Sequence, residues 1–509
     1  MTVTNLPNQI PPARRNPLFN LNRLAEILPE CWPWQAGVIL LALLLGAGAG
    51  LLAVLLPNPL IGFVGVIGLV VVGIMFARPL FTLGAAASIC CLLPFGTIPV
   101  KLGLTFTFLE AALLVLFLVW LLRLVVVNRL QAVEGLVSSP FDWAILLFIG
   151  LSVFCYILNW QTANSSELIH SYAKLLLAIL QFFAVINIVR TQVGLDTLIT
   201  VLMLAGSVAG YLGALLTRLP RDLQFSLLSQ LRIVGYPTDS RVLRYVEDDP
   251  LKPQRATGTS IDPNSFGGLL VLVIALLVTQ LVSVKPLLPR WLLSLMLLGP
   301  LFSLYLTYSR GSQLGAIAVI GFVALLKYRK IFLYALPFLL AGAVWLPSTF
   351  LGARLAQGFA LEDQATVLRL AEYQNALDVI GSHPWFGVGF GSIATLNLTV
   401  PVSMIYLTIA ERMGLIGLGL FLLLMFLFLS YALNRLDKLK VDRHQANLLG
   451  LTGGVIGALA VGLLDHYFFN GEFSHMATLL WLFMGLAVVQ IKVGEAHPAT
   501  ELSSESPSK

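Results

Sequence analysis

Fourteen apolar runs, each about long enough to cross a bilayer, follow one another along this chain of 509 residues. A helix crosses a bilayer with on the order of 20 consecutive apolar residues. Such a series leaves no room for a water-soluble core, so we predict an all-α integral membrane protein with 12–14 transmembrane helices. The runs are 36–56, 58–76, 80–96, 107–127, 139–158, 168–189, 194–215, 262–284, 289–308, 311–327, 331–349, 414–433, 446–464 and 475–492.

Composition agrees with this class. Hydrophobic residues make up 58% of the chain, charged residues only 11%, and the mean hydropathy is +0.89. That is too little polar surface for a soluble protein of this length. The cysteines at 31, 90, 91 and 155 show neither a disulfide framework nor a zinc spacing. We therefore expect packing cysteines, no metal and no cofactor.

Lysine and arginine set the expected orientation. A cytoplasmic N-terminus puts eighteen of the 31 basic residues on the inner side. Seven others crowd the loop 216–260, which we place outside, because inversion would expose the basic clusters at 327–330 and 435–443. The expected order is a cytoplasmic tail (1–35), transmembrane helices (36–349) with the basic outer loop, an outer-face insertion (350–412), further transmembrane helices (413–493) and a cytoplasmic tail (494–509). Both termini are then cytoplasmic.

One long passage of the second half, 369–417, is not a lipid-facing helix, because charged residues interrupt its apolar ones. Spacing predicts an amphipathic helix over 366–381 with an apolar stripe of Leu370, Tyr373, Leu377 and Ile380. The glycine-rich GSHPWFGVGFG ends it. The run 401–433 is too long for one crossing, so we expect 401–412 to be a separate outer-face helix. A plain surface helix with a connecting loop is the alternative.

The order of residues in this passage resembles the O-antigen ligase and polymerase superfamily of bacterial membrane proteins. The matching pattern is R-x-x-x-aromatic, H-P-x-F-G-V-G-x-G and Y-L-x-x-x-x-E-x-x-G-L-I-G, beginning at Arg369, His383 and Tyr406. RATGTSIDPNSF (255–266) and TYSRGSQLG (307–315) are similar to the family's motifs and stand in the same order. The resemblance covers roughly 255–490.

This resemblance implies an architecture like that of the GT-C glycosyltransferases and an active site on the outer face of a bacterial inner membrane. It implies substrates that are glycan units on polyprenyl diphosphate and an acceptor that is a glycan or a lipid. Membrane lipids and polysaccharide-assembly proteins are the further partners expected, and nucleic acid is not one. No nucleotide-phosphate loop or Rossmann fingerprint is present, which disfavours a soluble nucleotide-sugar donor.

Arginine is the residue type expected to bind a leaving diphosphate. It stays charged when desolvated and clasps phosphate oxygens through two parallel hydrogen bonds. The candidates are Arg255, Arg310, Arg369 and Lys174, the last on one helix face with Glu167 and His170. Interfacial snorkelling is the alternative for Arg310 and Lys174, and helix capping accounts for Asp262-Pro263-Asn264.

The residue that takes the acceptor's proton is not evident. In ligases of this superfamily a His-Asn pair precedes the Tyr-Leu pair, and here Ser403 stands at the histidine position. A serine hydroxyl is a far weaker base than an imidazole. The candidate bases on the outer face are Glu411, Asp465 and His466, although capping or orienting is the more ordinary role for the last two.

These observations favour a membrane glycosyltransferase of the O-antigen polymerase or ligase type. Because the ligase-type histidine is the feature lost, a repeat-unit polymerase fits better than a ligase. A small-anion transporter and a non-catalytic subunit of a polysaccharide assembly machine are the alternatives. The transporter predicts polar motifs at both ends of the helix bundle, and the non-catalytic subunit predicts that no base is present.

Overall fold

The computed structural model describes residues 77–98, 105–129, 136–236, 242–345, 364–391 and 402–496, with isolated positions at 71–75 and 348–356. The chain divides into two compact units, 1–78 and 79–509. The architecture below is that of the second unit. The predicted N-terminal tail, the runs 36–56 and most of 58–76, the segment 392–401 and the end of the C-terminal tail lie outside the described residues.

Every predicted apolar run from 80–96 onward coincides with a helix to within a few residues, which confirms the all-α class. Among the described residues, five helices are long and apolar enough to cross a membrane, namely α8, α9, α11, α17 and α19, and several shorter apolar helices accompany them. The described helices are α4 (Pro79–Leu92), α5 (Phe108–Arg129), α6 (Asp142–Leu158), α7 (Trp160–Ala163), α8 (Ser166–Ile188), α9 (Gln192–Leu216), α10 (Arg221–Gln230), α11 (Pro263–Val282), α12 (Arg290–Leu306), α13 (Arg310–Leu326), α14 (Lys330–Trp345), α16 (Gln364–Ser382), α17 (Ile405–Leu436), α18 (Asp442–Val461) and α19 (Ser474–Ala496).

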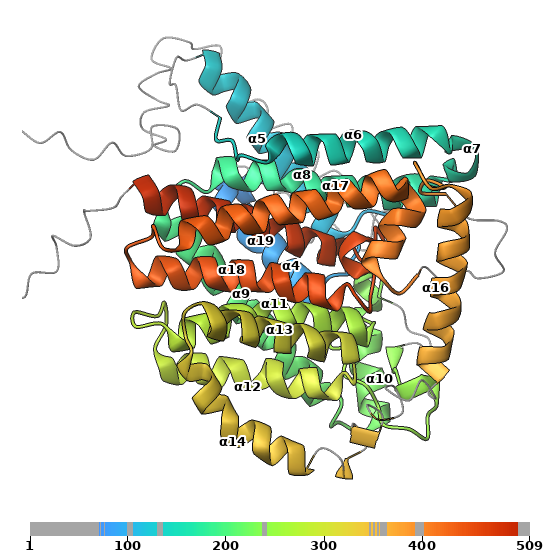
Figure 1. Cartoon of the computed structure of the whole chain (residues 1–509), viewed down its shortest axis with the longest axis vertical. Helices are drawn as coiled ribbons and strands as arrows, with labels where there is room; N and C mark the ends of the chain where they lie inside the picture. The colour runs from blue at the N-terminus through green and yellow to red at the C-terminus, as the bar shows by residue number, and fades with distance from the viewer. Residues whose placement is uncertain are drawn as a thin grey trace, which may run out of the picture. The chain divides into compact units, whose positions relative to one another are not determined.

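Helices α11 and α19 form the centre of the unit. Both are buried at nearly every position, as expected of helices that are apolar all round. Helix α11 packs against α12, α13 and α18, and α19 packs against α8 and α18 (Figure 1). The surrounding helices α6, α12 and α17 expose leucine, isoleucine and phenylalanine side chains, as the lipid-facing helices of a membrane protein do.

Helix α18 reaches the centre because its contact face is made of small residues. A Cβ at Gly454 would lie 2.6 Å from the Phe483 ring, and one at Gly457 would lie 2.6 Å from Val271 and 2.7 Å from Val319. Small residues let helix backbones approach closely, which is how helices associate in lipid. The small residues of α18 therefore let it pack closely against α11, α13 and α19.

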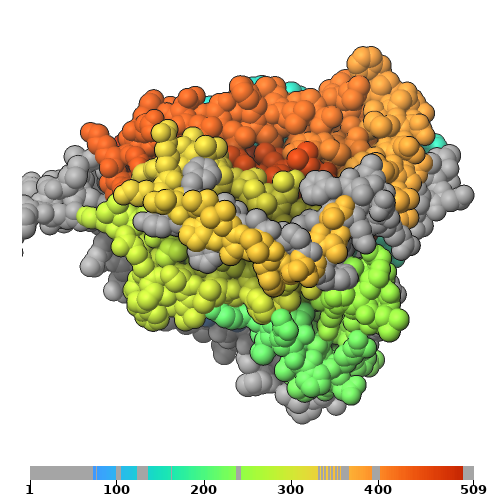
Figure 2. Space-filling model, turned by 60° about the horizontal axis from the view of Figure 1, so that its bottom comes forward, coloured from blue at the N-terminus to red at the C-terminus, as the bar shows by residue number. Residues whose placement is uncertain are grey.

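Helix α16 runs across one end of the bundle (Figure 1). Helix α10, from the basic loop, lies toward the same end, as Figure 2 also shows (α16 light orange, α10 green). The helix predicted over 366–381 is confirmed, but the predicted stripe is only half right: Tyr373 and Ile380 face the bundle, whereas Leu370 and Leu377 are 42% and 57% exposed. The face turned to the bundle instead carries Arg369, Glu372, Tyr373, Ala376 and Ile380. This face packs inward because its polar side chains find partners at the ends of the bundle helices, namely Asp465 and the backbone of Ser403.

The opposite end of the bundle is joined by a buried hydrogen-bonded network. The Asn447 amide nitrogen donates to Asp196 Oδ1 at 2.8 Å and to Gln490 Oε1 at 2.9 Å, and its oxygen accepts from Gln280 Nε2 at 2.7 Å. Gln192 completes it by bonding both Asp196 and Gln490. Since these residues come from α9, α11, α18 and α19, the network links four helices at this end.

Candidate functional site

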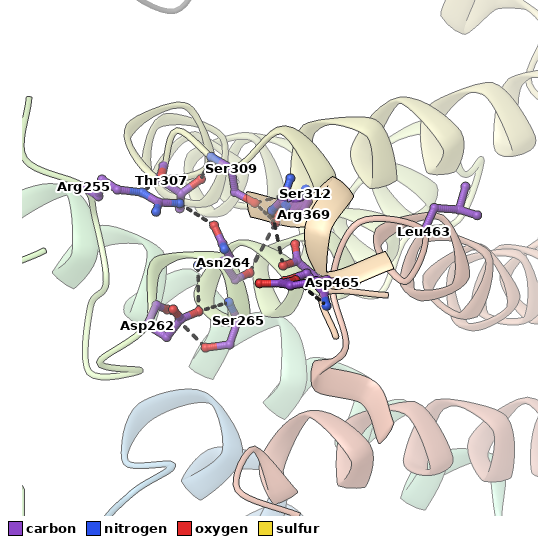
Figure 3. A network of polar contacts seen from close by, with 12 residues as sticks. Arg255, Asp262, Asn264, Ser265, Thr307, Ser309, Ser312, Arg369, Leu463 and Asp465 are labelled. Carbon is purple, nitrogen blue, oxygen red and sulfur yellow. Dashed lines mark hydrogen bonds and ion pairs between the residues drawn. The ribbon is translucent and has the colours of Figure 1, made fainter. Parts of the chain in front are cut away.

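The segment 255–265 is a loop that leads into α11, and Asp262 caps the N-terminus of that helix. Asp262 Oδ1 accepts from the backbone N–H of Asn264 at 2.9 Å and of Ser265 at 2.7 Å, with Pro263 at the first helical position. The capping predicted for this motif is thus confirmed. The cap places the Asn264 side chain beside Arg255, whose guanidinium bonds the Asn264 amide oxygen and, through Nε, the Thr307 carbonyl at 2.7 Å (Figure 3).

The motif TYSRG forms the turn from α12 into α13. Tyr308 adopts a left-handed backbone with φ of 52°, and Ser309 then caps α13 by accepting from the Ser312 N–H at 3.3 Å. Arg310 is the first residue of α13 and is half-buried. A Cβ at Gly311 would lie only 2.9 Å from Asp465 Oδ2, so glycine leaves room for this carboxylate to approach.

Helix α16 contributes three polar side chains from successive turns of one face. The Arg369 guanidinium lies 3.7 Å from Asp465 Oδ1 (Figure 3). The Glu372 carboxylate accepts from the Ser403 N–H at 3.0 Å, and the Tyr373 hydroxyl donates to the Ser403 carbonyl at 3.2 Å. The backbone of residue 403 is therefore held from both sides by the helix that carries Arg369.

Asp465 is the most deeply buried acid of this group, with 2% of its surface exposed. Its Oδ2 has no hydrogen-bond partner within the described part of the chain. Burial raises the pKa of Asp465 to about 7, although the Arg369 and Arg255 guanidinium groups act to lower it. Burial also lowers the pKa of the neighbouring His466 to about 4, so this imidazole is neutral at pH 7. Asp465 is thus the better matched of the two to proton transfer near neutral pH.

The glycine-rich loop after α16 closes a break in α17. The backbone of α17 leaves the helical conformation at Gly414 (φ 69°, ψ −176°), so 405–413 forms a separate helical piece, as expected from its length. The N–H groups of Val388 and Gly389 donate to the carbonyls of Glu411 and Arg412 at 2.8 and 3.0 Å. A Cβ at Gly387 or Gly414, both at positive φ, would overlap backbone atoms across this contact. The loop caps a helix end and is no nucleotide-binding loop.

Two of the predicted site residues lie apart from the arginines. The Lys174 ammonium is 3.0 Å from Glu110 Oε1, and His170 Nε2 is 3.2 Å from the same oxygen, while Glu167 is exposed. Glu411 is buried beneath the glycine-rich loop, and no interaction among the described residues links it to Arg255, Arg369 or Asp465.

The structure therefore brings together Arg255, Arg369, Asp465, His466 and the backbone of Ser403, with Arg310 beside them in the α12–α13 turn. Sequence reasoning did not identify Glu110 as the partner of Lys174, nor the positions of Glu372 and Tyr373 around residue 403. The sequence signal for the latter was present, because 369, 372 and 373 share a helix face.

Comparison with known proteins agrees with this arrangement. The family model described as O-antigen ligase matches residues 295–422, which include the S-R-G turn, α16, the glycine-rich loop and the first part of α17. No curated protein matches the chain. With its apolar helices and this match, the chain is a membrane protein that contains a region similar to the O-antigen ligase family.

Proposed function

We propose that the protein transfers or polymerises glycan units carried on polyprenyl diphosphate, at the outer face of a bacterial inner membrane. One observation carries the proposal: Arg255, Asp465 and Arg369 of α16, distant in sequence, lie at the same end of the bundle. A cationic, partly desolvated site with one carboxyl that titrates near neutrality suits transfer from a diphosphate leaving group.

In this reaction the Asp465 carboxylate takes the proton of an acceptor hydroxyl as its oxygen forms a bond to the anomeric carbon of the donor sugar. The bond from that carbon to the diphosphate oxygen breaks, and its electron pair stays on the diphosphate. Arg255, Arg310 and Arg369 stabilise the growing charge through charge-assisted hydrogen bonds. Attack from the side opposite the leaving group would invert the anomeric centre.

Two features bear on the alternatives. A transport path would need polar groups that open at both ends, whereas the far end of the bundle is linked by the fully paired Asn447 network. A non-catalytic subunit does not require a buried carboxyl group whose pKa is near 7, such as that of Asp465. Ser403 at the ligase histidine position favours a polymerase, with Asp465 as the base.

The test is substitution of the three arginines in a purified, reconstituted protein supplied with its lipid-linked glycan. We expect Arg255→Ala, Arg310→Ala and Arg369→Ala each to lower transfer by about 100-fold or more. The lysine variants should recover little, because a point charge does not reproduce the bidentate fork. Arg435→Ala, which removes a surface pair with Glu495 at the far end, is the matched control. Near-normal transfer by the three alanine variants would remove the support for this function.

A further inference from the structure

A cavity of about 150 Å³ lies where the last turns of α8 and α19 meet, at the end of the bundle that carries the Asn447 network. One wall is a single face of α19, formed by positions 489, 492, 493 and 496. The end of α8, at positions 186, 189 and 190, forms the second wall, and Val137, which precedes α6, forms the third. The cavity therefore lies between three segments that are distant in sequence.

The walls of this cavity are fixed by contacts outside it. The Val137 N–H donates to Asn187 Oδ1 at 2.9 Å, and Asn187 Nδ2 donates to the Val137 carbonyl at 3.2 Å. Arg190 Nε donates to the Asn187 carbonyl at 2.9 Å. One turn before the cavity α8 and α19 are in close contact, because a Cβ at Gly485 would lie 2.9 Å from the Val185 side chain. The space is thus bounded by segments that are hydrogen-bonded or tightly packed.

The lining combines an aliphatic surface with positive charge. Of the described residues that line the cavity, six are aliphatic, two are the cations Arg190 and Lys492, and none is acidic. A dry apolar cavity of this size is large enough for a benzene-sized group, and so for a short stretch of an acyl chain.

Lys492 is the cation whose partner is missing from the described part of the chain. It is half-buried, and no carboxylate of the described residues forms an ion pair with it. Glu495, one turn later on α19, pairs with Arg435, and Asp196 pairs with Arg443 at 3.7 Å. Partial burial of an ammonium group beside aliphatic side chains is costly unless an anion pairs with it. The site therefore suits a ligand that carries both an aliphatic chain and a negative charge.

We propose that this cavity binds an anionic phospholipid, with part of one acyl chain against the aliphatic walls and the headgroup phosphate at Lys492 and Arg190. Basic pockets between membrane helices attract anionic headgroups, and in the predicted orientation this end faces the cytoplasmic leaflet. The segment 497–509, which follows Ala496, is polar apart from Leu502 and suits an aliphatic cavity less well than an acyl chain does. The inference does not depend on the proposed function.

Thermal unfolding of the purified full-length protein in detergent tests the site, with dioleoyl phosphatidylglycerol or dioleoyl phosphatidylcholine as the added lipid. The two lipids share their acyl chains and differ in net charge. A lipid that binds the folded protein raises its melting temperature by mass action, and we expect the half-saturating concentration to be lower for phosphatidylglycerol. Lys492→Gln should weaken phosphatidylglycerol binding about tenfold, the loss expected for a hydrogen bond between charged groups, and leave phosphatidylcholine binding unchanged.

Two further variants separate this site from general attraction of lipid to the protein. Lys438→Gln removes an exposed lysine that does not line the cavity, and it should bind phosphatidylglycerol as the wild type does. Val489→Phe fills part of the cavity and should weaken binding of both lipids; if this variant does not fold, Ala496→Leu at the exposed edge serves the same purpose.

Three results would overturn the inference. They are an equal response of the wild type to the two lipids, a wild-type response in folded Lys492→Gln, and an unchanged response in the cavity-filling variant. A chain without 497–509 that responds to phosphatidylglycerol when the full-length chain does not would identify that segment as the occupant instead. Because the readout is lipid binding and not glycan transfer, this inference and the proposed function can fail separately.

Discussion

The pH dependence of glycan transfer is the most direct test of Asp465 as the base. The pKa of this carboxyl is raised to about 7 by burial, and only its ionised form accepts a proton. Transfer should therefore be low at acid pH and rise through pH 7 to a plateau. One pH unit below the midpoint about a tenth of the carboxyl is ionised, so the rate at pH 6 should be about a tenth of the plateau.

Two substitutions distinguish this titration from general pH effects. Asp465→Asn should lower the plateau rate by about 100- to 10,000-fold, the usual contribution of a general base, and abolish the pH dependence. Arg369 lies 3.7 Å from Asp465 and lowers its pKa, so Arg369→Gln should move the midpoint of the residual activity to higher pH. Glu472→Gln, an exposed acid of the same loop, is the control. A flat wild-type profile between pH 6 and 8, or a wild-type profile in Asp465→Asn, would show that Asp465 is not the base.

Two further predictions concern topology and stability. On a cysteine-free background, an impermeant thiol reagent added from outside should label Ser226→Cys in α10 and not Lys438→Cys at the far end; the reverse pattern would invert the orientation. Asn447→Ala should lower the free energy of unfolding by about 1–3 kcal/mol, because it leaves the buried amide of Gln280 unpaired, and an unchanged melting temperature in detergent would show that the network contributes little.

The positions of the helices could be predicted closely because a bilayer dictates the length of each apolar run. The capping by Asp262 was equally predictable, since a cap is a local contact between residues two and three positions apart. Contacts between helices could not be predicted in this way, because they join residues that are far apart in the sequence. Lys174 lies near a helix end and therefore fitted a diphosphate site, yet Glu110, three helices earlier in α5, pairs with it.

The packed face of α16 illustrates the same limit. Hydrophobic periodicity favoured Leu370 and Leu377 beside Tyr373. A helix that lies across one end of the bundle meets backbone groups and charges there, so Arg369 and Glu372 turn inward with Tyr373 instead. The role of the glycine-rich loop was also beyond sequence reasoning, because its partners, the carbonyls of Glu411 and Arg412, exist only where α17 breaks.

Ser403 and Asp465 are joined by a short series of hydrogen bonds. The Ser403 backbone bonds Glu372 and Tyr373, and two residues later the Ile405 N–H donates to the Asp465 carbonyl at 3.1 Å. If Asp465 takes the proton, as we propose, a base at position 403 is not required, because both positions are held by the same backbone contacts.

Two substitutions at position 403 test the role of Asp465 as the base. Ser403→Ala should keep most polymer synthesis, because the bonds at this residue come from its backbone, and normal protein levels with lost synthesis would show that the hydroxyl itself is needed. Ser403→His should partly restore transfer to Asp465→Asn, because an imidazole with an ordinary pKa near 6.5 is a competent base at neutral pH. The restored activity should then rise with pH again, whereas Asp465→Asn alone shows no such rise, because only the neutral imidazole accepts a proton. If Ser403→His restores nothing while the double variant folds and binds polyprenyl diphosphate normally, the two positions do not serve the same hydroxyl, and Asp465 is a positioning partner of Arg369 instead of the base.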